Sequence, residues 1–268
     1  MTDGTNSTGA ASTGSWALEA LGIRKRFGGV IALDGVDVRL PAGQVTGLVG
    51  ANGSGKSTFV DCITGFLAPD AGTIALAGSD LTRASRRRRA LAGLRRTFQA
   101  VHAYEGMTAL EQVEVAQQET DGTGWWDAVL RTPRLRSAQA AAIERAEHEL
   151  ERVGLVEKRH EQADALSYGQ QKLLGLACGL VTDPTVLCLD EPLAGVSPRQ
   201  TDLLVEVLDG LRAEHRTLLV IEHNMDFVAH MSDHVVVFAQ GAVAAAGGVE
   251  VLQDDRVFEA LMGMGVTA

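Results

Sequence analysis

Short runs of apolar residues alternate with helical patterns along the chain from Trp16 onward. Three of these runs are rich in valine and leucine, and each has the length of a strand that is buried on both faces. The runs are QVTGLVG at 44–50, TVLCLD at 185–190 and TLLVIE at 217–222. Alternation of such strands with helices predicts an α/β domain with a mostly parallel sheet, whose ligand sites lie at its carboxyl edge.

A helical pattern replaces the strand pattern between about residues 105 and 181. Within it, apolar residues recur on one face of the segment 137–153, and Gly154 is placed to end that helix. We therefore expect one domain over 16–268, in which a core of about 16–104 and 182–268 carries an inserted helical subdomain. The apolar positions of the segment are Ile143, Ala146, Leu150 and Val153.

The two ends of the chain have patterns of their own. The segment 234–248 predicts two short strands that turn at Gln240 and Gly241. Residues 1–15 have neither a basic start nor an apolar block, so we expect a disordered, solvated tail rather than a secretory signal. A last helix is expected around Val257, Phe258, Leu261 and Met262.

Composition narrows the class of protein further. The chain has 34 acidic and 24 basic residues and a net charge of −10, which disfavours a partner made of nucleic acid. Its uncharged runs are interrupted by glycines and polar residues, so no membrane span is expected. The three cysteines have no zinc-site or disulfide spacing, and this favours a reducing cytosol.

The clearest chemical motif is GANGSGKS at 50–57. It fits the phosphate-loop pattern G-x-x-x-x-G-K-[ST], follows a buried strand and precedes a helical run. Glycines allow successive backbone N–H groups to face one anion, and the helix start adds its positive dipole end. Lys56 is then expected to reach the β- and γ-phosphates of a nucleotide, and Ser57 to bind Mg²⁺.

Two carboxylates follow the apolar strand VLCL at 186–189. Asp190 is expected to hold Mg²⁺, directly or through water. Glu191 lies one residue later, where a carboxylate can accept a proton from the water that attacks the γ-phosphate. Gln99 in RRTFQAV and His223 in VIEHN are candidates to complete the site, Gln99 by touching both metal and water.

The segment LSYGQQ at 166–171 opens an apolar helical run. With the motifs above, it makes the chain resemble the ATP-binding subunits of ABC transporters, whose signature is usually written LSGGQ. Tyr168 stands here in place of the first glycine. The resemblance implies a P-loop NTPase core of RecA type with an antiparallel β subdomain and a helical subdomain, and a head-to-tail dimer with two ATP molecules between the subunits.

The resemblance assigns roles position by position. Glu191, His223, Gln99 and Lys56 would be catalytic, with His223 as the switch histidine and Gln99 as the Q-loop glutamine. Ser57, Gln99 and Asp190 would hold Mg²⁺, and Phe27 would stack on adenine. ATP would contact Phe27, Asn52, Gly53, Ser54, Gly55, Lys56, Ser57 and Thr58 of one subunit and Ser167, Gly169 and Gln170 of the other.

Longer segments are similar to the ATPases of branched-chain amino acid importers. This resemblance implies an ATP-hydrolysing importer subunit that is cytoplasmic and peripheral on the inner face of the cell membrane. Its implied partners are a second ATPase subunit, identical or different, two membrane permease subunits and, indirectly, an extracytoplasmic solute-binding protein. The similar segments are KRFGGVIALDGV at 25–36, ITGFLAPDAGTI at 63–74, RRTFQAV at 95–101 and IEHNMDFV at 221–228.

Other functions stay open at this point. The same mechanism serves an importer of urea or short-chain amides, because the solute is recognised by other chains. A soluble ABC ATPase that acts on ribosomes or DNA fits less well, since the chain has one motif set and no sustained heptads. The run Arg86–Arg89 is expected to form a solvated helical face, with lipid headgroups or acidic permease residues as the alternative partners.

Overall fold

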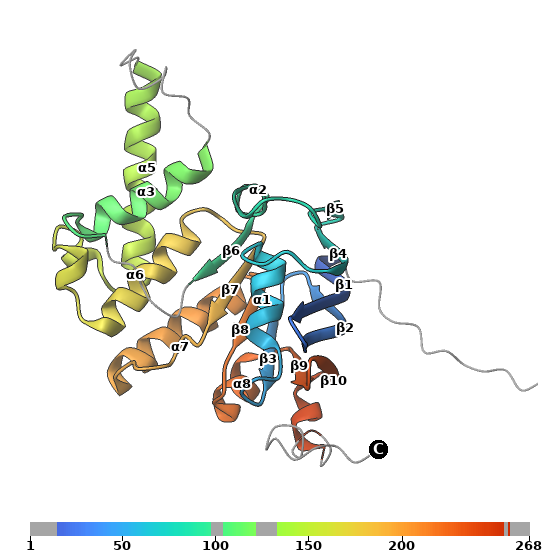
Figure 1. The fold of residues 1–268 in the computed structure, drawn as a ribbon. Coiled ribbons are helices and arrows are strands. Elements are labelled where there is room, and N and C mark those ends of the chain that lie inside the picture. The colour runs from blue at the N-terminus through green and yellow to red at the C-terminus, as the bar shows by residue number, and fades with distance from the viewer. Residues whose placement is uncertain (1–14, 98–103, 122–132, 255–256, 258–268) are drawn as a thin grey trace, which may run out of the picture.

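The computed structural model describes residues 15–97, 104–121, 133–254 and 257. A six-stranded sheet runs through this part in the order β10-β9-β3-β8-β7-β6 (Figure 1). Neighbouring strands from β9 to β6 are parallel, and β10 pairs antiparallel with β9. The strands are β3 (Val45–Gly50), β6 (Leu94–Thr97), β7 (Val186–Asp190), β8 (Leu218–Ile221), β9 (His234–Ala239) and β10 (Ala242–Gly247).

The strands expected from the sequence are confirmed. Every residue of β3, β7 and β8 is buried, as their unbroken apolar patterns require. Strands β9 and β10 turn at Gln240 and Gly241, whose φ angles of 49° and 80° are those of a two-residue hairpin loop. Val257 is buried, whereas the rest of the expected last helix and residues 1–14 of the expected tail lie outside the described residues.

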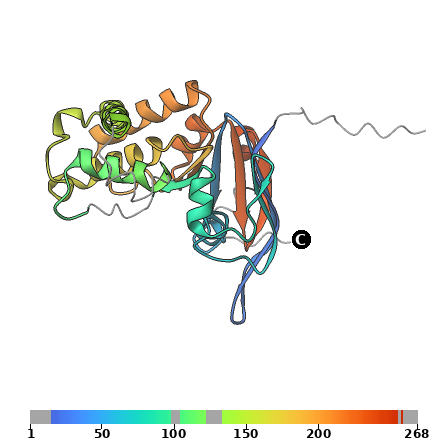
Figure 2. The ribbon, with the colours of Figure 1, turned by 90° about the horizontal axis from the view of Figure 1, so that it is seen from above.

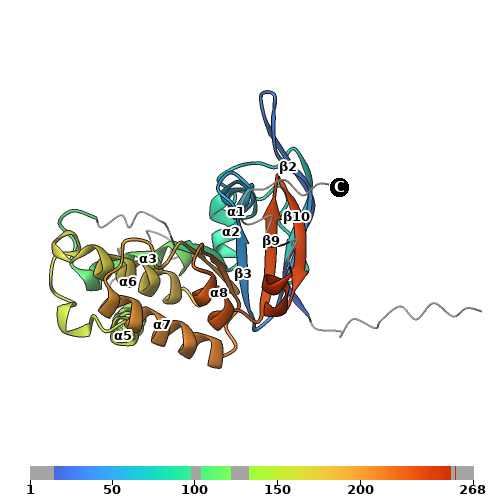
Figure 3. The same ribbon diagram turned by 90° about the horizontal axis from the view of Figure 1, so that it is seen from below.

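A second, antiparallel sheet has the order β2-β1-β4-β5 and packs against the first. Helix α1 (Lys56–Thr64) contacts strands of both sheets, and one apolar core joins all three (Figure 3). Leu18, Leu48 and Ile63 are fully buried in that core. The hairpin of β1 and β2 extends beyond the body (Figure 2). The strands are β1 (Trp16–Phe27), β2 (Val30–Pro41), β4 (Ala71–Leu76) and β5 (Ser79–Asp80).

A group of helices covers the opposite face of the large sheet (Figure 3). Ala146, Leu150 and Val153 are fully buried there, which confirms the expected apolar face, and Ile143 is half-buried. Gly154 ends its helix with a φ of 70°. The helices are α3 (Ala109–Asp121), α5 (Pro133–Arg152), α6 (Tyr168–Leu180), α7 (Pro198–Ala213) and α8 (Met225–Met231), with short 3-10 turns η1 (Val156–Lys158), η2 (Ala163–Ala165) and η3 (Val249–Gln253).

The predicted fold class is confirmed: a mixed α/β molecule with a mostly parallel sheet, an antiparallel sheet and a group of helices. The limits of the helical subdomain at about 105 and 181 stay a prediction. Within the described ranges, none of the helices combines the length and the apolar composition that a bilayer crossing requires.

The four arginines at 86–89 were expected to form a solvated helical face, but one of them, Arg89, is buried. Helix α2 (Arg86–Leu91) leaves Arg86 to Arg88 exposed, but Arg89 is only 2% exposed. The Arg89 guanidinium donates to the carbonyl oxygens of Cys62 and Ile63, at 2.6 and 2.7 Å, and to two more carbonyls of the loop before α2. Arg89 therefore satisfies carbonyls in the last turn of α1 and holds that helix to α2.

We predict that Arg89→Met lowers the free energy of unfolding by about 3 kcal/mol, because several buried carbonyls lose their donor. The matched control is Arg87→Met, which removes an exposed arginine of the same helix and should change the stability by less than about 0.5 kcal/mol. Urea unfolding of both variants measures the difference. Equal stabilities would contradict the structural role of Arg89.

Candidate nucleotide-binding site

The loop between β3 and α1 has a conformation that its glycines make possible. Gly50, Gly53 and Gly55 have φ angles of 150°, 77° and 106°. A Cβ atom on Gly55 would lie 2.7 Å from the carbonyl oxygen of Ala32, and one on Gly50 would collide with the carbonyl oxygen of Phe238. Backbone of strands from both sheets therefore lies directly against the loop, and a side chain at either glycine would collide with it.

The start of α1 carries the features of an anion site. Its N-cap, Gly55, offers no side-chain acceptor, and the first turn has no acidic residue. The first N–H groups of a helix lack partners within that helix, so they and the dipole favour a bound anion. The hydroxyl of Ser54 is buried without a hydrogen-bond partner. This donor set fits the phosphates of a nucleotide.

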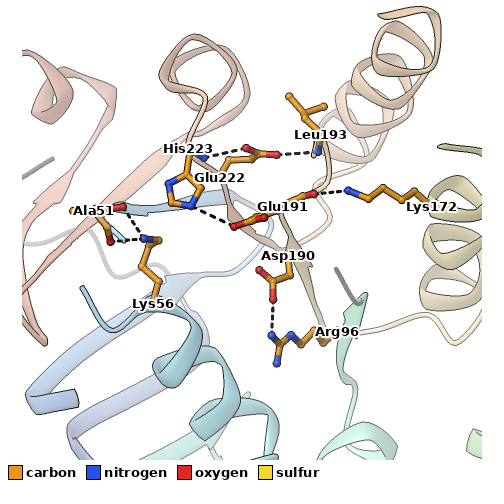
Figure 4. Close-up of polar contacts among 10 residues, drawn as sticks. Ala51, Lys56, Arg96, Lys172, Asp190, Glu191, Leu193, Glu222 and His223 are labelled. Atoms are coloured by element: carbon orange, nitrogen blue, oxygen red, sulfur yellow. Dashed lines mark hydrogen bonds and ion pairs between the residues drawn. The ribbon is translucent and has the colours of Figure 1, made fainter. Parts of the chain in front are cut away.

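Lys56 adds a cation to the same loop. Its ammonium donates to the carbonyl oxygens of Gly50 and Ala51, at 2.6 and 2.9 Å, and the residue is 5% exposed (Figure 4). Burial lowers the pKa of Lys56, while the charges of Glu191 and Asp190 oppose that shift. Lys56 is thus a partly desolvated cation next to the helix start, whereas Asn52, Gly53 and Ser57 are exposed around it.

Asp190, the expected metal ligand, is buried at the end of β7. It is 8% exposed, and its Oδ2 atom accepts a hydrogen bond of 2.5 Å from Arg96 in β6. The other terminal nitrogen of Arg96 binds Asp61 in α1, also at 2.5 Å. Arg96 therefore orients the Asp190 carboxylate and ties β6, β7 and α1 together. The sequence analysis missed Arg96, although it is an arginine in a short strand that leads to Gln99.

Glu191 and His223 come from neighbouring strands and meet in space. Nε2 of His223 lies 3.3 Å from Oε1 of Glu191, and both side chains are partly exposed (Figure 4). Glu191 has a positive φ of 46°, a conformation that costs a residue other than glycine about 1–3 kcal/mol. Its N–H donates to the carbonyl oxygen of Ile221 in β8 at 2.9 Å, which carries the sheet pairing one residue beyond β7.

The signature segment begins α6. Ser167 is the N-cap, and it forms a capping box with Gln170. Gln200 of α7 donates to the Ser167 hydroxyl at 2.9 Å, and its amide lies against Gly169, which is buried. Gln200, which was not a candidate, thus covers the small residue that is expected to approach a phosphate. Its position two residues after Pro198 carries no motif that points to this contact.

The structure brings some of the expected residues together and leaves others apart. Lys56, Asp190, Glu191 and His223 gather at the carboxyl ends of β3, β7 and β8 (Figure 4). Helix α6, by contrast, packs on α3, α5, α7 and β6, whereas α1 packs on α2 and on strands of both sheets. Phe27 is 48% exposed near the tip of the β1–β2 hairpin. Gln99 lies outside the described residues.

Comparison with known proteins agrees with this geometry. Residues 33–194 match the family described as ABC transporter. The chain belongs to that family. It is 41% identical over 92% of its length to the high-affinity branched-chain amino acid transport ATP-binding protein BraF of Pseudomonas aeruginosa, of which 97% is covered. It is 40% identical to the high-affinity branched-chain amino acid transport ATP-binding protein LivG of Escherichia coli, over 92% of this chain and 97% of LivG.

Solved structures of the family share the fold. A nucleotide-free ATP-binding cassette from an ABC transporter has a TM-score of 0.77 and 32% identity, covering 91% of this chain and 98% of its own. The ADP conformation of an ABC transporter cassette has a TM-score of 0.78 and 32% identity, covering 92% of this chain and 99% of its own. The chain is therefore an ABC-type ATPase subunit that binds nucleotide.

We predict that Lys56→Ala weakens the binding of a fluorescent ATP analogue at least about tenfold, a change of about 1.4 kcal/mol, because the partly buried cation at the phosphate loop is lost. The control is Lys158→Ala, which removes a partly exposed lysine paired with Glu161. Titration followed by fluorescence measures both dissociation constants. An unchanged constant in Lys56→Ala would contradict the placement of the phosphates at this loop.

Proposed function

We propose that this chain hydrolyses ATP to energise the uptake of branched-chain amino acids through separate permease subunits. The observation that carries the chemical part is the Glu191–His223 pair, 3.3 Å apart at the sheet edge that also holds the phosphate loop. The solute is proposed from the relatives, since the names of BraF and LivG both give branched-chain amino acid transport.

Hydrolysis requires a water molecule in line with the γ-phosphate. Glu191 accepts a proton from that water, and His223 donates a hydrogen bond to a γ-phosphate oxygen. Lys56 binds the β- and γ-phosphates and offsets the negative charge that develops on them. Phe27 stacks on the adenine ring. Phosphate oxygens accept hydrogen bonds from the backbone between Asn52 and Thr58.

The donor set beside the phosphate loop fits Mg²⁺. Ser57 offers an exposed hydroxyl at the start of α1, and Asp190 offers a carboxylate oxygen that Arg96 does not occupy. Oxygen ligands of this kind suit Mg²⁺, which supplies positive charge to the phosphates when it is bound. We assign Ser57, Asp190 and Gln99 to it, with Gln99 as the Q-loop ligand.

A second subunit completes the site in this proposal. Ser167, Gly169 and Gln170 lie at the start of α6, which packs on α3, α5, α7 and β6, whereas α1 packs on α2 and on strands of both sheets. By the family resemblance, they contribute to an ATP molecule held by a partner subunit in a head-to-tail dimer. That partner is a second copy of this chain or a different ATPase subunit.

Two permease subunits are the proposed membrane partners, and this chain binds them from the cytoplasmic face. A solute-binding protein outside the cytoplasm delivers the solute to the same permease subunits. A cavity of about 360 Å³ between β6, α3 and α6 offers a place for a permease segment. Its wall includes apolar surface from Ala116 and Leu176 and the charged side chains of Arg86 and Arg96. The chain itself lies peripherally on the inner face of the membrane.

We predict that Glu191→Gln keeps ATP binding, abolishes turnover and accumulates a closed dimer, because the amide cannot take up the proton of the attacking water. Phosphate release measures turnover, and size-exclusion chromatography with ATP measures the dimer. The control is Glu214→Gln, a carboxylate at the end of α7 that pairs with Arg152, and it should hydrolyse ATP normally. Near-normal hydrolysis by Glu191→Gln would remove Glu191 from its role.

We predict that cells whose native chain is replaced by Glu191→Gln lose uptake of labelled leucine, isoleucine and valine, with uptake of urea and acetamide unchanged. The measurement is initial uptake rate with all five solutes in parallel. Loss of urea or acetamide uptake alone would keep the ATPase mechanism and replace the proposed solute. Unchanged uptake of every solute would contradict the transport assignment.

A further inference from the structure

The short segment 191–194 after β7 carries Glu191 and is held from two sides by charged side chains that the mechanism does not use. Glu222 lies on one side, directly after β8, and is 5% exposed. Lys172 of α6 lies on the other side and is 9% exposed. Both side chains point at backbone atoms of the segment (Figure 4).

Glu222 joins the two loops that carry the proposed catalytic side chains. Its Oε1 atom accepts a hydrogen bond from the N–H of Leu193 at 2.8 Å, and its Oε2 atom accepts one from the N–H of His223 at 3.0 Å. One carboxylate therefore fixes the backbone two residues after Glu191 and the backbone of His223 itself. Hydrogen bonds to a charged acceptor are stronger than neutral ones, which makes this link stiff.

Lys172 supplies the complementary donors. Its ammonium donates to the carbonyl oxygens of Glu191 at 2.7 Å, Pro192 at 3.3 Å and Ala194 at 2.6 Å. Burial lowers the pKa of Lys172, and the charge of Glu222 is the largest of the neighbouring charges that raise it. An ammonium group has three protons, so the three carbonyl contacts match its full donor capacity.

The two side chains explain how a strained residue keeps its position. Glu191 has a φ of 46°, and strain of this kind persists only where the surroundings over-determine the backbone. Here the N–H of Glu191 pairs with β8, its carbonyl binds Lys172, and the segment after it binds Glu222. Together with the Glu222–His223 hydrogen bond, these contacts hold the backbone from which the side chains of Glu191 and His223 extend.

We propose that Glu222 and Lys172 are positioning residues that act through Glu191 and His223, holding the catalytic carboxylate and the switch histidine at their working distance. The inference rests on the proposed function, because it takes Glu191 as the base. Loss of either positioning residue should slow the hydrolytic step without weakening nucleotide binding, since the hydrogen bonds of both side chains go to the segment 191–194 and to His223.

The first test is Glu222→Gln, in which an amide N–H₂ group replaces one acceptor and faces a backbone N–H. We expect kcat for ATP to fall at least about tenfold while the dissociation constant for ATP stays within about twofold. Hydrogen exchange of the peptide containing Leu193 should become at least about tenfold faster. Exchange followed by mass spectrometry reads the segment directly and does not depend on activity.

The matched control is Asp233→Asn. Asp233 also accepts a backbone N–H, that of Val45 at 2.9 Å, and binds a side chain, that of Arg212, but it lies at the other end of β3. Its variant weakens one backbone hydrogen bond of the same kind, together with an ion pair, far from Glu191. We expect near-normal kcat and unchanged exchange at Leu193. A fall in kcat equal to that of Glu222→Gln at an equal melting temperature would overturn the proposal.

A second pair of variants tests the other side and covers the case in which Glu222→Gln fails to fold. Lys172→Met removes all three donors and should lower kcat, whereas Lys172→Arg keeps donors and should restore most of it. Equal kcat values for wild type and Lys172→Met would overturn the proposal. Glu191→Gln, measured in parallel, separates the two claims. If Glu191→Gln stays active, the assignment of Glu191 as the base fails. If Glu191→Gln is inactive but Glu222→Gln keeps a kcat within about twofold of wild type, only the positioning role is refuted.

Discussion

Parallel pairing of β3, β8 and β7 is the constraint on which the rest of the site depends. All three strands are buried along their whole length, and parallel neighbours end at the same edge of a sheet. The phosphate loop, the two carboxylates and His223 are far apart in sequence, yet this pairing delivers them to one place. Apolar burial in the strands thus determines where the polar chemistry lies.

The same edge concentrates charge, much of it buried, that other side chains must balance. Arg96 forms an ion pair with Asp190. Lys172 and Glu222 form hydrogen bonds with the backbone of the segment 191–194. Each of these partners is largely buried, so each fixes a geometry that a solvated side chain would leave loose. The proposed catalytic pair, Glu191 and His223, stays partly exposed.

Sequence reasoning found the parts of the site that follow a motif or a buried strand. The glycine pattern around Lys56 and the apolar run before Asp190 each carry a physical requirement that is local in the chain. Glu222 ends an equally buried strand, but only the fold reveals that its acceptors face Leu193. In the sequence, Lys172 is recognisable only as the single charge within an apolar helix. The burial of Arg89 depends on carbonyl groups of α1, a helix that lies more than twenty residues earlier in the chain. Contacts between remote segments were therefore the part that could not be predicted.

The central claim is that the edge of the parallel sheet places Glu191 and His223 at the γ-phosphate of bound ATP. The most direct test is a crystal structure of the Glu191→Gln variant with ATP and Mg²⁺. The account predicts a γ-phosphate oxygen within about 3 Å of both Lys56 Nζ and His223 Nε2, and an in-line water at the side chain of position 191. A γ-phosphate bound away from His223, or a position-191 side chain turned from it, would contradict the account.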